Sequence, residues 1–116
     1  MATSTQFQSP IATDLSATIL LGETESSAIR TSGTAMTGII APVNFTGTDI
    51  QFKGSIDGID YYFINNLATG SKLSGKLVAG EASATTPTDF SMWNLIKIVA
   101  DPQNEDVELQ ILARAI

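Results

Sequence analysis

Residues 49–64, DIQFKGSIDGIDYYFI, constrain the fold of the chain more than any other segment. Ile50, Phe52 and Ile56 alternate with polar or small side chains, which is the two-residue period of a strand with one buried face. The dipeptide Asp57-Gly58 supplies the positive φ that tight hairpin turns require, and the aromatic run after it favours a second extended arm. These features predict a β-hairpin that turns at Asp57-Gly58 and buries Ile50, Phe52 and Ile56.

Other segments carry the same short period or are rich in β-branched residues. They predict further strands at residues 15–21, 34–41, 73–78, 81–86, 95–100 and 107–113. We expect the last two to form a terminal hairpin around the loop DPQNED, residues 87–93 to make one short helical turn, and Phe45 to plug the core. About eight short strands with long crossovers predict an all-β fold, a two-sheet antiparallel sandwich of the jelly-roll type.

At 116 residues the chain has the length of a single domain. Residues 1–14 are mostly polar and nearly uncharged, with Phe7 and Ile11 as the only large apolar residues. They predict a flexible N-terminal arm ahead of a β-sandwich domain at residues 15–116. Such an arm either frays or orders against a neighbouring subunit. Its start lacks the basic and apolar runs of a secretory signal, and no later segment has membrane-spanning length, so we expect synthesis in a cytoplasm and no membrane association.

Charge and composition narrow the classes of function. The net charge is −6 and the six basic residues are scattered, so we expect no positively charged stripe for nucleic acid. The acidic excess is typical of a soluble surface, with steering of a cationic ligand as the alternative. Cysteine and histidine are absent, which excludes disulfides, thiolate zinc sites and the commonest general base. We therefore expect a protein that is not an enzyme and needs no cofactor or metal.

Two acidic loops are the remaining candidates for chemistry. One contains Asp57 and Asp60. The other, at residues 101–106, contains Asp101, Glu105 and Asp106. Paired carboxylates can do acid/base work, and several oxygen ligands can hold calcium. Both groups lie in predicted exposed turns, where Asp, Asn and Gly are also the ordinary residues, so the turn interpretation is favoured.

Aromatic residues near the hairpin suggest a further possibility. Tyr61, Tyr62 and Trp93 could form a stacking platform for a sugar or a base. Strand alternation places Tyr61 and Phe63 on one side and Tyr62 and Ile64 on the other. We therefore expect one tyrosine in the core or an interface and the other partly exposed.

Three stretches, taken in order, resemble a broad family of small virion structural proteins of tailed bacteriophages: ATILLGETESSAI, MTGIIAPVNFTGTDIQFKGSIDGIDYY and PTDFSMWNLIKI. The resemblance covers residues 17–99, and its specificity lies mainly in the spacing of Gly38-Ile39, Pro42, Phe52, Ser55, Asp57-Gly58 and Tyr61. The hairpin GSIDGIDYY also resembles that of discoidin-like carbohydrate-binding modules, a jelly-roll group. The compact loop DPQNED departs from the longer, glycine-containing loop of many phage relatives, so contacts made by that loop do not carry over.

The phage resemblance implies a β-sandwich component of a virus particle, above all a capsid decoration or cement protein, with a tail or fibre accessory as the alternative. Such a protein would assemble in the host cytoplasm, lie on the capsid surface of the virion, and bind the major capsid protein and further copies of itself as a homo-oligomer. Large aromatic and apolar side chains dominate interface cores. The candidate interface residues are Phe7, Ile11, Tyr62 and Trp93.

The second resemblance implies a different class, a carbohydrate-binding module. Its candidate ligand residues are Asp57 and Asp60, with Tyr61 or Tyr62 as the stacking ring. We expect an exposed aromatic ring beside a fixed carboxylate to support this alternative.

Overall fold

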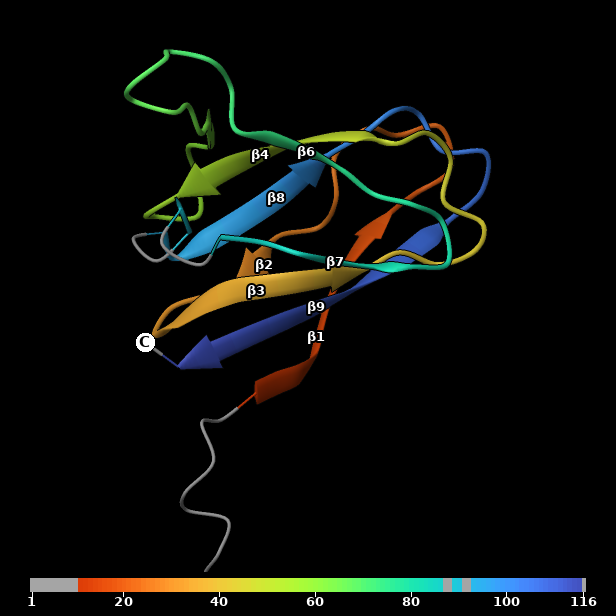
Figure 1. Ribbon diagram of the computed structural model, residues 1–116, viewed down its shortest axis with the longest axis horizontal. Coiled ribbons are helices and arrows are strands. Elements are labelled where there is room, and N and C mark those ends of the chain that lie inside the picture. Colours follow the sequence, from red (N-terminus) through yellow and green to blue (C-terminus); the bar gives the residue numbers. More distant parts are fainter. Residues whose placement is uncertain (1–10, 87–88, 91–92, 116) are drawn as a thin grey trace, which may run out of the picture.

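The strands form two antiparallel sheets that enclose one core (Figure 1). The computed structural model describes residues 11–86, 89–90 and 93–115. Over these residues the strands are β1 (Ile11–Ile19), β2 (Ile29–Arg30), β3 (Thr34–Ile40), β4 (Asp49–Ser55), β5 (Tyr62–Phe63), β6 (Ser74–Lys76), β7 (Ala82–Ala84), β8 (Leu95–Val99) and β9 (Val107–Ala115). The predicted all-β class and the two-sheet antiparallel sandwich are confirmed. The short strand β2 was not predicted.

The strand order and the connections between strands define two ends of the sandwich. The first sheet has the order β1-β9-β3-β7, and the second has the order β2-β8-β4-β5, with β6 also paired to β4. Successive strands such as β3 and β4 lie in different sheets, so several connections cross from one sheet to the other. The hairpin end is where β4 stops at Ser55. The opposite end, where β4 starts at Asp49, holds the connections 41–48, 77–81 and 100–106.

The terminal hairpin predicted for residues 95–100 and 107–113 is wrong. β8 pairs with β2 and β4 in the second sheet, whereas β9 pairs with β1 and β3 in the first. The loop DPQNED therefore crosses between the sheets, and its Gln103 is only 2% exposed. The Gln103 amide donates to the carbonyls of Thr46 (3.0 Å) and Asp101 (2.8 Å) and accepts from the Thr46 N–H (2.9 Å). These bonds fix the loop as an arch across the end of the sandwich.

Inward-facing apolar side chains from both sheets fill the core, whose burial supplies the main stabilising term. The fully buried large apolar residues include Ile19, Ile29, Met36, Ile39, Leu77, Phe90, Ile96, Ile98, Leu109 and Ile111. The rings of Phe52 and Phe90 meet edge-on with centroids 4.9 Å apart. Phe45 is 6% exposed, which confirms its predicted place in the core.

β1 begins inside the segment that was predicted as an arm. Ile11 pairs with Arg114 and Ala12 with Ala113 of β9, and the register then shifts before Leu15. Residues 11–14 therefore belong to the first sheet of their own chain. Phe7 and the rest of residues 1–10 lie outside the described residues, so the interface predicted for Phe7 stays a prediction.

The helical turn predicted for residues 87–93 falls partly outside the described residues. At its two ends, the Asp89 N–H donates to the Thr86 carbonyl (3.1 Å) and the Trp93 N–H donates to the Phe90 carbonyl (3.3 Å). Within the described part of the chain, no helix has the length and apolar character needed to cross a membrane.

Candidate functional site at the hairpin end

The turn predicted at Asp57-Gly58 is built on a buried serine. Ser55 ends β4, and its Oγ accepts a hydrogen bond from the Gly58 N–H (2.8 Å) and donates one to Asp57 Oδ1 (3.1 Å). Gly58 has a φ of 80°, so the predicted positive φ is confirmed. Because the chain turns here, Ile56 leaves the alternation of β4 and is 69% exposed. Its predicted burial is therefore wrong.

The Asp57 carboxylate is held in one orientation by this turn. Its Oδ1 accepts hydrogen bonds from the backbone N–H groups of Ile59 (2.9 Å) and Asp60 (3.1 Å). Bonds of this kind favour the charged form, and they lower the pKa of Asp57. The side chain is exposed and these bonds converge on Oδ1. Oδ2 is therefore the oxygen best placed to accept hydrogen bonds from a ligand.

Asp57 lies in the wall of a surface pocket, which we call the hairpin pocket. The pocket has a volume of about 290 Å³ and is lined by Ile56, Asp57, Asp60, Tyr62 and Trp93. Tyr62 is 62% exposed, whereas Trp93 is half-buried. The hairpin pocket thus combines two carboxylates with two aromatic rings, a pattern suited to stacking and to hydrogen bonding of hydroxyl or amino groups.

Trp93 reaches the pocket because β4 carries a glycine beneath it. A Cβ added at Gly54 would lie 2.7 Å from Trp93 Cε3, so the indole ring rests directly on the strand backbone. Thr31 Oγ1 donates to the Trp93 carbonyl (2.7 Å), and Asn94 Nδ2 donates to the Ile56 carbonyl (2.9 Å). Trp93 Nε1 is buried and has no hydrogen-bond partner within the described part of the chain.

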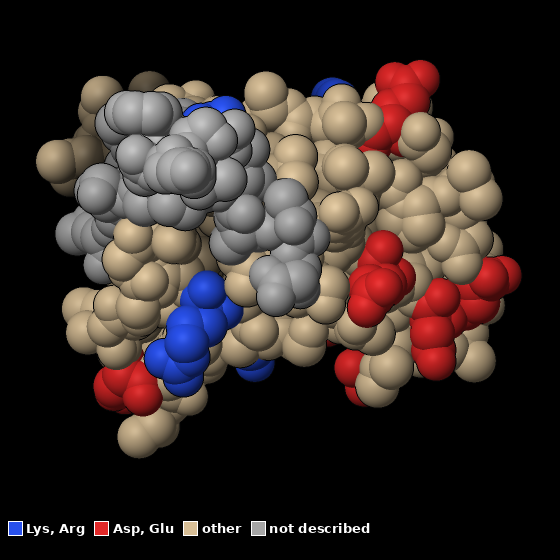
Figure 2. All heavy atoms as spheres, turned by 90° about the horizontal axis from the view of Figure 1, so that it is seen from below, with Lys and Arg blue, Asp and Glu red and all other residues tan. Residues whose placement is uncertain are grey.

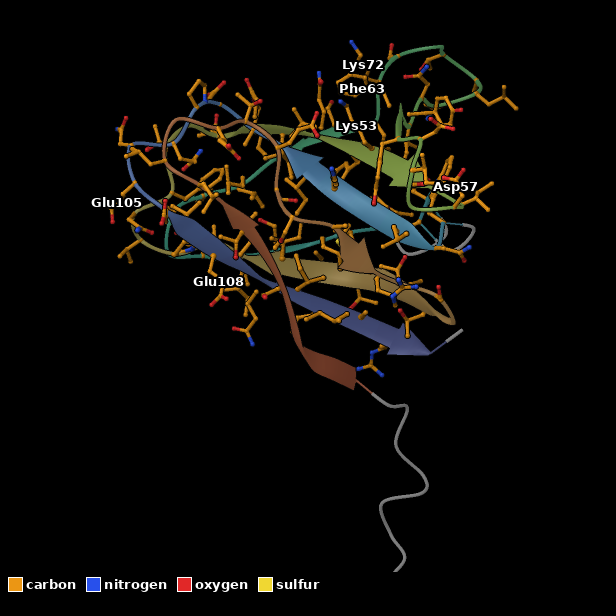
Figure 3. All side chains as sticks on the ribbon, turned by 180° about the vertical axis from the view of Figure 1, so that it is seen from behind. Lys53, Asp57, Phe63, Lys72, Glu105 and Glu108 are labelled. Carbon is orange, nitrogen blue, oxygen red and sulfur yellow. The ribbon has the colours of Figure 1, made fainter. Side chains whose placement is uncertain are left out.

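The outer surface of the second sheet carries three lysines over two aromatic rings, which we call the lysine face. Lys53 and Lys72 lie with their ammonium nitrogens 4.8 and 4.6 Å from the Phe63 ring centroid. Figure 3 shows these three side chains grouped on the same face. Lys97 lies 4.4 Å from the ring centroid of Tyr61. Each of these geometries is a cation–π contact.

Glu25 balances two of these cations. Lys53 and Lys97 lie opposite each other on β4 and β8, which brings like charges together. Glu25 accepts from Lys53 (2.5 Å) and lies 3.8 Å from Lys97. Tyr61 thus belongs to the lysine face and is not among the residues that line the hairpin pocket. The predicted separation of Tyr61 and Tyr62 onto different sides is consistent with this placement.

The opposite end of the sandwich, which we call the acidic end, has a different character. Its exposed acidic residues are Glu23, Asp49, Glu81, Asp101, Glu105, Asp106 and Glu108, of which Asp49 pairs with Lys76. Figure 2 shows acidic side chains gathered towards one end of the face in view, and Figure 3 places Glu105 and Glu108 far from Asp57. Exposed aliphatic side chains lie among them: Leu20 (49%), Leu21 (63%), Val43 (87%) and Val78 (48%).

Some acidic side chains at this end hold the loops in place by accepting hydrogen bonds. Asp106 Oδ1 accepts from the Leu21 N–H (2.8 Å), and Glu105 Oε1 accepts from Asn44 Nδ2 (2.6 Å). Over residues 11–86, 89–90 and 93–115, no three acidic side chains gather in a group that could hold a metal ion. The hydrogen bonds of Glu105 and Asp106 agree with the turn interpretation of this loop.

The structure brings together some of the predicted site residues and separates others. Asp57, Asp60, Tyr62 and Trp93 line one pocket, although they were assigned to different functional alternatives. Sequence reasoning did not identify Gly54 as the residue whose lack of a side chain leaves room for the Trp93 ring. An isolated glycine inside a strand can indicate close approach of another group, but it does not say which group approaches.

Comparison with known proteins gives a likeness in fold. No protein-family model and no curated protein sequence matches the chain. Among solved structures, the SPBc2 prophage-derived protein YomS has a TM-score of 0.51 at 11% identity, covering 86% of this chain and 93% of YomS. The chain therefore shares a β-sandwich fold with a protein of prophage origin.

Two weaker likenesses were also found. A protein of the Bacillus endospore appendages, described as disulfide-linked pili, has a TM-score of 0.45 at 13% identity and covers 99% of this chain and 96% of its own. The carbohydrate-binding module CBM32-1 from a family 31 glycoside hydrolase of Clostridium perfringens has a TM-score of 0.45 at 11% identity, with coverages of 87% and 94%. Neither likeness is strong enough to carry a functional argument.

Proposed function

We propose that the chain is a structural protein of a bacteriophage virion, and more specifically a capsid decoration protein that bridges neighbouring subunits of the head shell. The fold shared with a prophage-derived protein and the sequence resemblance to small phage virion proteins support the phage assignment. One observation carries the bridging role. Exposed apolar side chains gather at both ends of the sandwich, so a single copy has two separate contact surfaces.

The two surfaces are spaced for bridging. The acidic end exposes Leu20, Leu21, Val43 and Val78, and the hairpin end exposes Ile56 (69%), Ile59 (80%) and Tyr62 (62%). The seven residues of β4 separate these ends by about 20 Å. Clustered exposed apolar residues on a soluble domain are typical of interaction sites. A rigid sandwich with one such surface at each end can hold two neighbours at a fixed distance.

The proposed mechanism is the burial of exposed apolar side chains against neighbouring subunits, with no chemical step. Each contact is small, but a capsid repeats it by symmetry, and binding through both ends raises the effective affinity through multivalency. The partners proposed are the major capsid protein and further copies of the chain, on the capsid surface. The proposal involves no catalytic step, cofactor, nucleic acid or membrane.

The bridging role is tested with particles of the phage whose genome encodes the chain, stripped of the protein and re-incubated with variants. Leu21→Ser and Val43→Ser change the acidic end, Ile59→Ser changes the hairpin end, and each is expected to lower both retained protein and resistance of the shell to heat. Leu67→Ser is the matched control, because Leu67 is 99% exposed and lies in the connection 64–73, outside both the hairpin turn and the connections of the acidic end. Equal binding by all four variants would contradict the proposal.

A second function, carbohydrate binding, is favoured by one observation at the hairpin pocket. A carboxylate fixed by backbone hydrogen bonds, that of Asp57, lies in the same pocket as the exposed ring of Tyr62. In this alternative Tyr62 stacks on a sugar ring and Asp57 Oδ2 accepts from its hydroxyls. Tyr61 is unsuited to the same task, because Lys97 already lies over its ring.

Glycan-array binding by the isolated chain tests this second function. Binding that is lost in Tyr62→Ala and Asp57→Asn but kept in Tyr61→Ala would establish a carbohydrate site in the hairpin pocket. Absence of binding by the wild-type chain would remove this candidate and leave the bridging role unaffected.

A further inference from the structure

A groove opens along one side of the sandwich, between β6 in the second sheet and β7 in the first. It encloses a volume of about 170 Å³. Its apolar lining comes from both sheets and from the connections beside them: Ile39, Ile50, Phe52, Leu73, Leu77 and Phe90. All of these residues except Leu73 are buried, so the floor of the groove is the core itself. We call this feature the edge groove.

The rims of the edge groove are two strands with free edges. Among the described strands, β7 pairs with β3 alone and β6 pairs with β4 alone. Their residues are mostly small, and a Cβ added at Gly75 would meet no heavy atom within 4 Å. Proteins usually protect sheet edges with charges, proline or bulges. β6 carries one such charge, Lys76, and Asp89 also lines the groove, whereas β7 carries neither a charge nor a proline. A sheet edge beside an apolar groove can accept an added strand from another segment.

We propose that the edge groove receives residues 1–10 of a second copy of the chain as an added strand, with the Phe7 ring in the cavity. An apolar cavity of about 150 Å³ is large enough to bind benzene, so the edge groove has room for one aromatic ring. Residues 1–10, MATSTQFQSP, contain a single aromatic residue and no charged side chain. The inference rests on the proposed function, because it names one contact through which copies assemble.

Strand order favours a second copy over the same chain. β1, which follows residues 1–10, and β7 lie at opposite edges of the first sheet. To reach its own groove, the segment would have to pass three strand spacings, or about 14 Å, along the outside of its own sheet. Two copies side by side bring the β1 edge of one against the β7 edge of the next. Ten extended residues span about 33 Å, which is ample for that junction.

This contact is heterologous, because it joins two different surfaces of the chain. It can therefore repeat from copy to copy around a ring or along a lattice. The groove shares no residue with the hairpin pocket and none with the exposed aliphatic side chains of the acidic end, so both of these surfaces stay free for other partners.

Introduced cysteines test the contact cleanly, since the chain contains no cysteine of its own. One full-length preparation carries Phe7→Cys and a second carries Gly75→Cys, a position with open space for the new side chain. Mixed under mild oxidation, the two are expected to form a disulfide-linked dimer several-fold faster than Phe7→Cys mixed with Leu67→Cys. Leu67 is 99% exposed and provides the matched collision control. Equal rates in the two mixtures would overturn the proposal.

A double variant, Phe7→Cys with Gly75→Cys, separates the second copy from the same chain. We expect linked multimers, whereas a disulfide-closed monomer at high dilution would contradict docking between copies. Analytical ultracentrifugation provides a readout that needs no cysteine: Phe7→Ser should lower the average mass and Phe7→Leu should restore it. If cross-linking fails while Leu21→Ser and Ile59→Ser still weaken particle binding, this inference is wrong and the bridging function stands.

Discussion

At the acidic end, a buried glutamine amide holds a loop that crosses between the sheets, whereas at the hairpin end a buried serine hydroxyl holds a turn. Gln103 and Ser55 both satisfy backbone groups from inside, which leaves the surrounding apolar side chains free to face outwards. The surfaces then differ. The acidic end presents aliphatic side chains among carboxylates, and the hairpin end presents rings around a pocket. Hydrogen bonds from a buried polar side chain thus hold the backbone at both ends. The acidic end is suited to a broad contact, and the hairpin end is suited to a group that enters its pocket.

The largest expected effect breaks the fastening of the acidic end. Gln103→Ala removes a buried amide and leaves the half-buried N–H and carbonyl of Thr46 without the partners that the amide supplies. We expect the free energy of unfolding to fall by about 3 kcal/mol, measured by urea denaturation. Asn104→Ala, at the next and exposed position, should change it by less than about 0.5 kcal/mol. Similar values for the two variants would show that the arch does not depend on this amide.

A smaller effect is expected at the hairpin end, where the indole ring rests on β4. Gly54→Ala places a methyl group against Trp93, and the overpacking should cost about 2 kcal/mol of unfolding free energy. Trp93 is the single tryptophan of the chain, so a shift in its fluorescence reports the displacement directly. Gly75→Ala is the matched control, because open space surrounds that position. An unchanged emission spectrum in Gly54→Ala would contradict the proposed seat of the ring.

The smallest effect concerns pH and the Asp57 turn. Because backbone hydrogen bonds lower the pKa of Asp57 below its ordinary 3.8, its charged form stabilises the fold. This contribution is fully present above pH 3.8 and is lost as the pH falls through the lowered pKa. The difference in unfolding free energy between wild type and Asp57→Asn should therefore be largest near neutral pH and shrink in acid. A difference that does not change with pH would show that the carboxylate charge is irrelevant to the turn.

Much of the fold follows from local patterns in the sequence. Alternation in residues 49–55 and the glycine of Asp57-Gly58 identify β4 and its turn, because period and positive φ are properties of a few neighbouring residues. The pattern that identifies β8 and β9 as strands does not say which sheet each one joins. That choice depends on contacts between residues far apart in the sequence, of which the bonds between Gln103 and Thr46, 57 positions apart, are an example.

The candidate site shows the same limit. Asp57, Asp60 and Tyr62 are close in sequence, so their proximity could be predicted. The pairing of Trp93 with Gly54 joins distant residues and depends on how the two sheets are connected. Ile56 was placed in the core because alternation by itself does not reveal where a strand ends.

We propose that the chain covers a phage shell by contacts at both ends of a rigid sandwich. Quantitative mass spectrometry of purified virions tests this claim most directly, by measuring the number of copies in each particle. A decoration protein follows the symmetry of the shell and should be present in hundreds of copies. A result of only a few copies, or of none, would contradict capsid decoration.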